Sequence, residues 1–169
     1  GTFPVPSGLS NNLGWWLYKD AAGNSQVIDA NAVEFKDQWQ ADSLCEGECG
    51  DNPYTTGLAG NWRFQKSHKF VNERVYAGAN SNQEDGVYAS FDQFDWIMPA
   101  SNPLWNMSNE VTRYSPYGFE VENRDALDNY FSARYGYKNS LNTAVAYNAR
   151  QMEVGSVNFE EPSECNHYF

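Results

Sequence analysis

The stretch "EVTRYSPYGFEVENRDAL", residues 110–127, decides the fold because it reads as two strands joined by a tight turn. Its Ser-Pro-Tyr-Gly tetrad places proline second and glycine fourth, the arrangement of a type I turn. In the return strand, Phe119 and Val121 alternate with Glu120 and Glu122. This alternation predicts an antiparallel hairpin with one face on the core and the other in water.

The rest of the chain extends this β pattern. Aromatic residues make up 16% of the 169 residues, whereas isoleucine occurs only twice. Aromatic side chains bury large areas and suit a pleated sheet. Alternating segments at residues 13–29 and 60–70 predict further strands. We therefore expect a mostly β fold, an antiparallel β-sandwich-like domain.

One segment predicts a short helix near residues 140–150. In "NSLNTAVAYNAR", residues 139–150, apolar and small residues recur at helical spacing, with Arg150 in the last turn, where a cation suits the helix dipole. Asn139 or Ser140 is the expected N-cap. The residues at helical spacing are Leu141, Ala144, Val145 and Asn148.

The glycines and prolines of residues 45–60 predict an internal boundary. We expect residues 1–57 to form an N-terminal β hairpin and loop region, the end of a preceding module. Residues 58–169 then form the motif-bearing β domain. The whole chain is expected to be a fragment of a longer protein.

The net charge of −11 argues against nucleic acid, because phosphate binding needs clustered Lys and Arg. No apolar run approaches 18 residues, which predicts no membrane insertion.

The three cysteines, Cys45, Cys49 and Cys165, are candidates for a disulfide, and their odd number leaves one without a mate inside the chain. The first two can close a small loop, or Cys165 can pair with either of them. Together with His167 they also have the ligand count of a structural zinc site, an alternative that the spacing favours less.

No cofactor is expected. The alternative is calcium, for which Asp85, Asp92 and Asp95 are the candidate ligands, although the segment lacks the regular alternation of a calcium loop.

The sequence contains none of the familiar nucleophile, zinc-protease or nucleotide motifs. A glycosidase needs two carboxyl groups across a sugar ring. Close acid pairs are present, but 22 acids produce such pairs by chance, and we expect no enzyme. His68 lies in a strand pattern and is expected to be a packed or exposed residue rather than a base. The acid pairs are Glu120 with Glu122, Asp92 with Asp95, and Glu160 with Glu161.

Carbohydrate binding is the alternative that deserves more weight, because exposed aromatic faces stack on sugars. Most aromatic residues here follow strand alternation, which is typical of a core. The candidates for glycan stacking are Trp62, Trp96 and Trp105. A glycan-active hydrolase fragment is the third reading.

Residues 60–161 resemble a module of very large secreted surface proteins of Bacteroidota, which look like cargo of the type IX secretion pathway. The resemblance rests on Gly60, Trp62 and Arg63, on Asp85-Gly86, on the core from Glu110 to Leu127, and on the run from Tyr135 to Arg150. Phe159, Glu160 and Glu161 are similar to the Phe-Glu-Asp-like motif at the end of the family's module. The resemblance covers about 100 residues. Asp128 stands where the family usually has glycine, which puts the local turn in question.

The resemblance implies a structural or adhesive segment of an extracellular or cell-surface protein. Its expected partners are neighbouring domains of its own chain, the secretion machinery, other surface proteins and glycans. An oxidising location favours the disulfide. Asp42-Ser43-Leu44 matches the short O-glycosylation pattern of that phylum, which makes Ser43 the candidate acceptor.

The resemblance also assigns scaffold roles to the central motif. Tyr114 and Tyr117 are expected to pack, and Pro116 and Gly118 to fix the corner. Acidic and amide side chains of the return strand are expected to bind backbone groups or nearby arginines, and they are Glu120, Glu122, Asn123 and Asp125.

Overall fold

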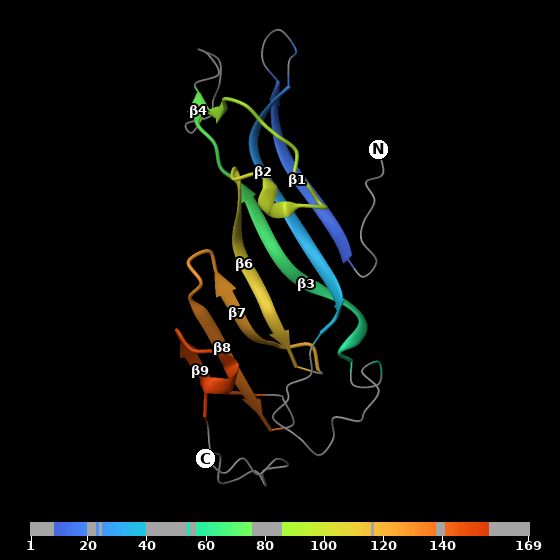
Figure 1. The fold of residues 1–169 in the computed structure, drawn as a ribbon, viewed down its shortest axis with the longest axis vertical. Coiled ribbons are helices and arrows are strands. Elements are labelled where there is room, and N and C mark those ends of the chain that lie inside the picture. Colours follow the sequence, from blue (N-terminus) through green and yellow to red (C-terminus); the bar gives the residue numbers. More distant parts are fainter. Residues whose placement is uncertain are drawn as a thin grey trace. The chain divides into compact units, whose positions relative to one another are not determined.

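The computed structural model describes residues 9–19, 23, 25–39, 54, 57–75, 86–115, 117–137 and 141–155. Strands dominate these ranges, and two short 3₁₀ helices complete them (Figure 1). The strands are β1 (Leu9–Lys19), β2 (Ser25–Gln38), β3 (Ala59–Phe70), β4 (Arg74–Val75), β5 (Val87–Tyr88), β6 (Trp105–Tyr114), β7 (Glu120–Asp125), β8 (Tyr130–Gly136) and β9 (Leu141–Tyr147). The 3₁₀ helices are η1 (Pro99–Ser101) and η2 (Gln151–Glu153).

Hydrogen bonding joins seven strands in the order β1-β2-β3-β6-β7-β8-β9, and β4 pairs with β5. The pairs β4–β5, β6–β7, β7–β8 and β8–β9 are antiparallel. The predicted mostly β, antiparallel, sandwich-like fold is therefore confirmed.

The chain forms two compact units. Unit 1 comprises residues 1–35 and 66–108, and unit 2 comprises residues 36–65 and 109–169. The predicted boundary after residue 57 lies inside unit 2, and the division of the chain at that point stays a prediction.

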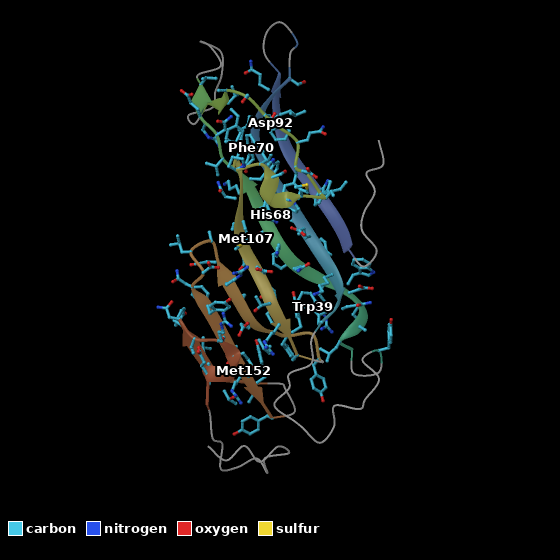
Figure 2. All side chains as sticks on the ribbon, in the orientation of Figure 1. Trp39, His68, Phe70, Asp92, Met107 and Met152 are labelled. Atoms are coloured by element: carbon cyan, nitrogen blue, oxygen red, sulfur yellow. The ribbon has the colours of Figure 1, made fainter. Side chains whose placement is uncertain are left out.

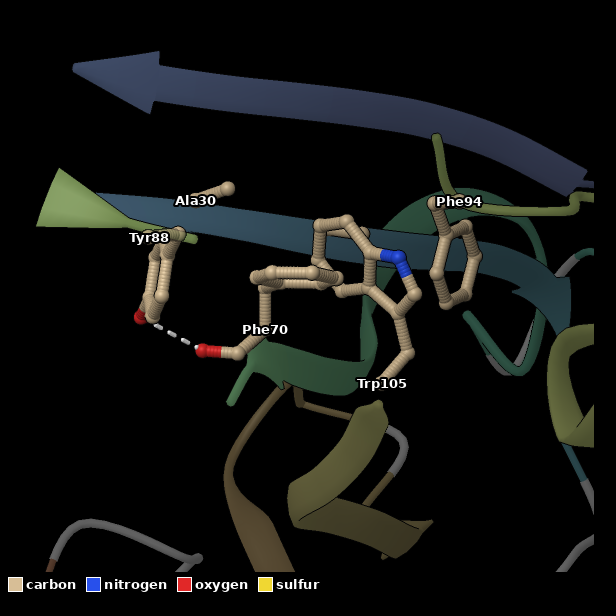
Figure 3. Close-up of a cluster of buried hydrophobic side chains, with 6 residues drawn as sticks. Ala30, Phe70, Tyr88, Phe94 and Trp105 are labelled. Carbon is tan, nitrogen blue, oxygen red and sulfur yellow. Dashed lines mark hydrogen bonds between the residues drawn. The ribbon is translucent and has the colours of Figure 1, made fainter. Parts of the chain in front are cut away.

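The core of unit 1 is a cluster in which rings from β3, β5, β6 and the segment between β5 and β6 pack with two alanines of β2. Phe70 is fully buried, and its ring meets the edges of Tyr88 and Trp105 with centroids 4.9 and 5.3 Å away (Figure 3). The Tyr88 hydroxyl donates to the Phe70 carbonyl oxygen at 2.7 Å. Ala30 and Ala32 are buried beneath these rings, where their small side chains leave room for the aromatic layer.

Unit 2 has its own core, made of Trp39, Leu58, Val111 and Tyr114, with Phe64 packed against it. The Trp39 and Tyr114 rings meet edge to face at 4.5 Å. Both cores are built mainly from aromatic side chains, as the composition predicts.

The predicted helix near residues 140–150 is wrong, because residues 141–147 form strand β9. β9 pairs with β8 from Phe131↔Tyr147 to Gly136↔Leu141. Thr143, Val145 and Tyr147 favour strands, and the backbone ladder to β8 outweighs the helical spacing. Between the end of β9 and residue 155, where the described part of the chain ends, the one helical element is the short η2 at Gln151–Glu153.

Candidate functional site

The turn of the β6–β7 hairpin has the geometry that its sequence predicts. The Gly118 amide donates to the Ser115 carbonyl at 3.0 Å, and the Ser115 amide donates to the Phe119 carbonyl at 2.8 Å. Gly118 has a φ of 91°, a left-handed value that favours glycine. The turn is therefore closed by backbone hydrogen bonds and ends at a left-handed glycine. Pro116 lies outside the described residues.

Arg63 on β3 ties this turn to the rest of unit 2. Its Nη1 donates to the Ser115 carbonyl at 3.3 Å, and its Nη2 donates to the Gly57 carbonyl at 2.8 Å. The guanidinium lies over the Tyr114 ring, 5.2 Å from the centroid. Arg63 thus contacts the hairpin about 50 residues away in the sequence.

Tyr114 is buried between Arg63 and Trp39. Its hydroxyl donates to the Phe64 carbonyl at 2.9 Å. Burial, together with the negative charge of Glu120, raises the pKa of Tyr114 to about 12. The expected packing of Tyr114 is confirmed. The expected packing of Tyr117 is wrong, because its side chain is 67% exposed at the tip of the turn.

The prediction that Glu120 and Glu122 both lie on a face in water is wrong for Glu122. Glu120 is exposed as predicted, but Glu122 is buried. Its Oε1 accepts from the Thr112 hydroxyl at 2.6 Å, and its Oε2 accepts from the Gln151 amide at 2.7 Å. The segment that contains η2 meets Glu122 through this last bond, so Glu122 is enclosed although Glu120 remains exposed. The expected binding of a backbone group by Glu122 is confirmed.

A second buried acid, Glu110 on β6, is paired with Arg124 on β7. The Arg124 Nε and Nη2 both donate to Glu110 Oε2, at 2.7 and 2.6 Å. The two residues are directly opposed in the ladder, which brings their side chains to the same face. Arg124 Nη1 also donates to Asp128 at 2.6 Å.

Asp125 organises the turn between β7 and β8. Its Oδ1 accepts from the amides of Leu127 and Asn129 at 2.8 and 3.0 Å, and its Oδ2 accepts from the Asn129 side chain at 2.9 Å. The side-chain bond from Asn129, with the backbone bonds, lowers the pKa of Asp125. The expected scaffold role of Asp125 is confirmed. Asp128 in this turn has a φ of 61°, the conformation that glycine at the same position would adopt most easily.

Unit 1 contains a buried ionisable pair. His68 on β3 and Glu34 on β2 are both buried, and Nε2 of the histidine lies 2.5 Å from Oε1 of the glutamate. The Phe94 ring covers the imidazole at a centroid distance of 4.8 Å. His68 and Phe70 both project from β3 (Figure 2). The histidine is therefore a packed residue, as expected.

The three aspartates that are candidate calcium ligands differ in their contacts. Asp95 Oδ1 accepts from the amides of Ile97 and Met98 at 2.9 and 3.1 Å, and the bond from Met98 contributes most to lowering the pKa of Asp95. Asp92 is exposed and its backbone carbonyl accepts from the Trp105 indole at 3.0 Å. Asp85 lies outside the described residues. Among the residues that are described, no three His, Cys, Asp or Glu side chains gather in a metal-binding group.

The three candidate tryptophans have different environments. Trp105 is buried against Phe70 and Phe94, so its proposed stacking on a glycan is wrong, because stacking needs an open ring face. Trp96 is partly buried and meets Phe94 edge to face at 4.6 Å. Trp62 is 48% exposed and remains a candidate.

Several predicted site residues lie outside the described part of the chain. They are Ser43, Cys45, Cys49, Glu160, Glu161, Cys165 and His167.

Of the acid pairs named from the sequence, Glu120 with Glu122 and Asp92 with Asp95 lie within the described residues. Glu120 is exposed, whereas Glu122 is buried and bonded to Thr112 and Gln151. The buried carboxylates of the described residues each contact a partner within their own unit: Glu34 contacts His68, Glu110 contacts Arg124, and Glu122 contacts Thr112 and Gln151. Such an arrangement fixes strands and turns.

Comparison of the chain with protein-family models, curated proteins and solved structures found no match. Within the described ranges there is no helix with the length and apolar character needed to cross a membrane.

Proposed function

We propose that this chain is a non-enzymatic structural or adhesive segment of a large extracellular or cell-surface protein exported by type IX secretion. The structural role is supported by one observation: polar side chains of the motif segments form hydrogen bonds within their own unit. Arg63, Tyr114 and Asp125 all bind carbonyl or amide groups of their own unit. Groups so occupied hold the backbone and are not presented to a substrate.

The secreted, surface-attached part of the proposal rests on the resemblance of residues 60–161 to surface modules of Bacteroidota. Neighbouring domains of the same chain, the secretion machinery and other surface proteins are the partners that this role implies. A disulfide among the three cysteines is proposed for the same reason, because the compartment is oxidising.

A mechanical experiment tests the structural role. The chain is placed between two marker domains and extended by single-molecule force spectroscopy. A load-bearing segment gives a discrete unfolding event, and Arg63→Gln lowers the force of that event because it removes the contacts of Arg63 with the hairpin. Extension without a discrete event overturns the structural role.

A second experiment separates the proposal from the hydrolase reading. Release of reducing ends is measured on neutral and acidic polysaccharides with the wild type and with Glu120→Gln, which changes an exposed side chain. We expect no release above buffer. Hydrolysis that disappears in Glu120→Gln while the circular dichroism spectrum is unchanged overturns the non-enzymatic assignment.

Surface location is tested on cells that produce the parent protein. Brief protease treatment of intact cells is expected to release fragments that an antibody to this segment recognises. Fragments that appear only after cell lysis contradict the surface assignment.

A further inference from the structure

The sheet formed by β7, β8 and β9 has two chemically different faces. On one face, Ser132 donates to the Ala149 carbonyl and Glu122 accepts from the Gln151 amide. These polar contacts attach the segment with η2 to that side. The opposite face has no such contact among the residues that are described, and its character is set by aromatic side chains.

The register identifies the residues of this second face. Asn123 opposes Phe131, which opposes Tyr147, so these three side chains form one row across the strands. Ala133 opposes Val145 two residues along. Because alternate residues of a strand share a face, Tyr135 belongs to the same side of β8. We call this set the aromatic face: Asn123, Phe131, Ala133, Tyr135, Val145 and Tyr147.

Several of these side chains are open to solvent. Tyr147 is 73% exposed and Val145 is 58% exposed. The Tyr147 ring meets Phe131 edge to face at 5.3 Å, and Tyr135 stacks on Phe119 at 4.8 Å with 22° between the ring planes. Phe119, itself 39% exposed, extends the row of rings toward the β6–β7 turn. The exposed aromatic surface is therefore that of Tyr147 on β9 and of Phe119, and the rings of Phe131 and Tyr135 on β8 are partly exposed beside them.

None of the six residues of the aromatic face is charged, and the charged residue that alternation places beside Asn123 on this side of β7 is the acid Asp125. The chain as a whole has a net charge of −11. Acidic ligands are repelled by the protein as a whole and find no cation on this face. Neutral ligands meet no such penalty. The face also carries an amide at Asn123 and the two phenol hydroxyls, so it combines ring surface with a few hydrogen-bonding groups, the usual composition of a site for a small polar molecule with apolar patches.

The adjacent edge of β9 is poorly suited to receive a strand from another protein. Arg134 pairs with Ala144 and Tyr135 pairs with Asn142, so Thr143 is the extra residue of a bulge. Beyond Tyr147, Asn148 has a φ of 56°, which turns the chain out of the strand. A bulge and an early end are features by which sheets avoid edge pairing. The rings rather than the edge are therefore the binding feature.

We propose that the aromatic face binds a neutral glycan, with the Tyr147 ring stacked on a sugar ring and the Asn123 amide and phenol hydroxyls bonded to its hydroxyl groups. This site differs from the tryptophans that the sequence singles out. It goes beyond the structural role and does not require it, because it involves neither Arg63 nor the buried acids.

The test is affinity gel electrophoresis of the intact chain through gels that contain galactomannan, xyloglucan or a mixed-linkage β-glucan, with alginate as the acidic comparison. Any retardation is quantified by titration calorimetry. We expect retardation by at least one neutral polysaccharide and none by alginate. We expect Tyr147→Ala to weaken binding about tenfold, the effect of one lost aromatic stacking contact. Tyr147→Phe keeps the ring and is expected to retain most of the affinity.

Trp62→Ala is the matched control. Trp62 is also an exposed aromatic residue of unit 2, but β6 and β7 lie between its strand and β8 in the sheet. Its loss is expected to leave the affinity within about twofold of wild type. Binding that depends on Trp62 and not on Tyr147, retardation only by alginate, or no retardation in any neutral gel overturns the proposal. Sedimentation of the wild type as a dimer that Val145→Glu dissociates also overturns it, since the face is then a protein contact.

Discussion

The guanidinium of Arg63 lies over the ring of Tyr114, 5.2 Å from its centroid, while its two Nη atoms donate to the carbonyls of Ser115 and Gly57. One side chain therefore stabilises a strand, a turn and the loop before β3. A guanidinium is suited to this position because it is planar and has several donors in a fixed geometry.

Replacing Arg63 with lysine is expected to lower the free energy of unfolding by about 1–2 kcal/mol, because an ammonium group cannot reach both carbonyls and still cover the ring. Urea denaturation followed by tryptophan fluorescence measures the change. Arg150→Lys is the control, since Arg150 covers Tyr130 at 4.7 Å on an exposed part of the chain. We expect that control to change stability by less than about 0.5 kcal/mol. Equal losses in both variants contradict the special role of Arg63.

Glu122→Gln and Glu120→Gln provide a matched pair on the same strand. The first places an NH₂ group opposite a donor, either the Thr112 hydroxyl or the Gln151 amide, and is expected to cost about 1–3 kcal/mol. The second changes an exposed side chain and is expected to cost less than about 0.5 kcal/mol. Thermal unfolding measures both, and hydrogen exchange at Gln151 reports whether η2 loosens in Glu122→Gln. Similar melting temperatures for the two variants would show that the buried contact is dispensable.

Asp128 has a left-handed backbone, so its replacements are expected to rank by conformational cost rather than by charge. Asp128→Gly relieves the backbone while losing an exposed ion pair with Arg124, and is expected to stay within about 1 kcal/mol of wild type. Asp128→Ala loses the same ion pair without relief, and is expected to be about 1 kcal/mol less stable than Asp128→Gly. Chemical denaturation of the two variants in parallel decides the order. Equal stability of Asp128→Ala and Asp128→Gly would show that the left-handed φ of residue 128 has no conformational cost.

Tyr114 is expected to make the protein sensitive to alkali. Its pKa is raised to about 12 in the folded chain, so the unfolded chain ionises first, near the ordinary value of 10.0. This contribution to stability is constant below pH 10 and is lost as the pH rises from 10 toward 12. Difference absorbance of tyrosinate is expected to show one late-titrating tyrosine, which is absent in Tyr114→Phe. If the late group persists in that variant, the assignment to Tyr114 is wrong.

The sequence predicts the hairpin well because its turn is local. Pro116, Gly118 and the alternation around them are all within ten residues, and local turn chemistry specifies such a unit. Whether residues 141–147 form a helix or a strand is not decided by local sequence in the same way. "LNTAVAY" satisfies helical spacing as well as strand propensity, and only its ladder with β8 decides between them.

The inward position of Glu122 could not be predicted from the hairpin alone. Alternation assigns Glu120 and Glu122 to one face in water, but the burial of Glu122 depends on its contact with η2, nearly 30 residues further along the chain. The pairing of His68 with Glu34 could not be predicted either, because it requires that β2 and β3 are neighbours in the sheet. The partnership of Arg63 with Tyr114 had a signal in the resemblance, since both residues belong to its motif.

The carboxylates of Glu34, Glu110 and Glu122 are enclosed with their partners, whereas Glu120 and Asp128 are among the acids that face solvent. Dissolved ions shield charges in water far more than charges inside a protein. Raising the salt concentration therefore weakens the repulsion between exposed carboxylates and has little effect on the contacts of the buried carboxylates. The free energy of unfolding is therefore expected to rise rather than fall as salt is added.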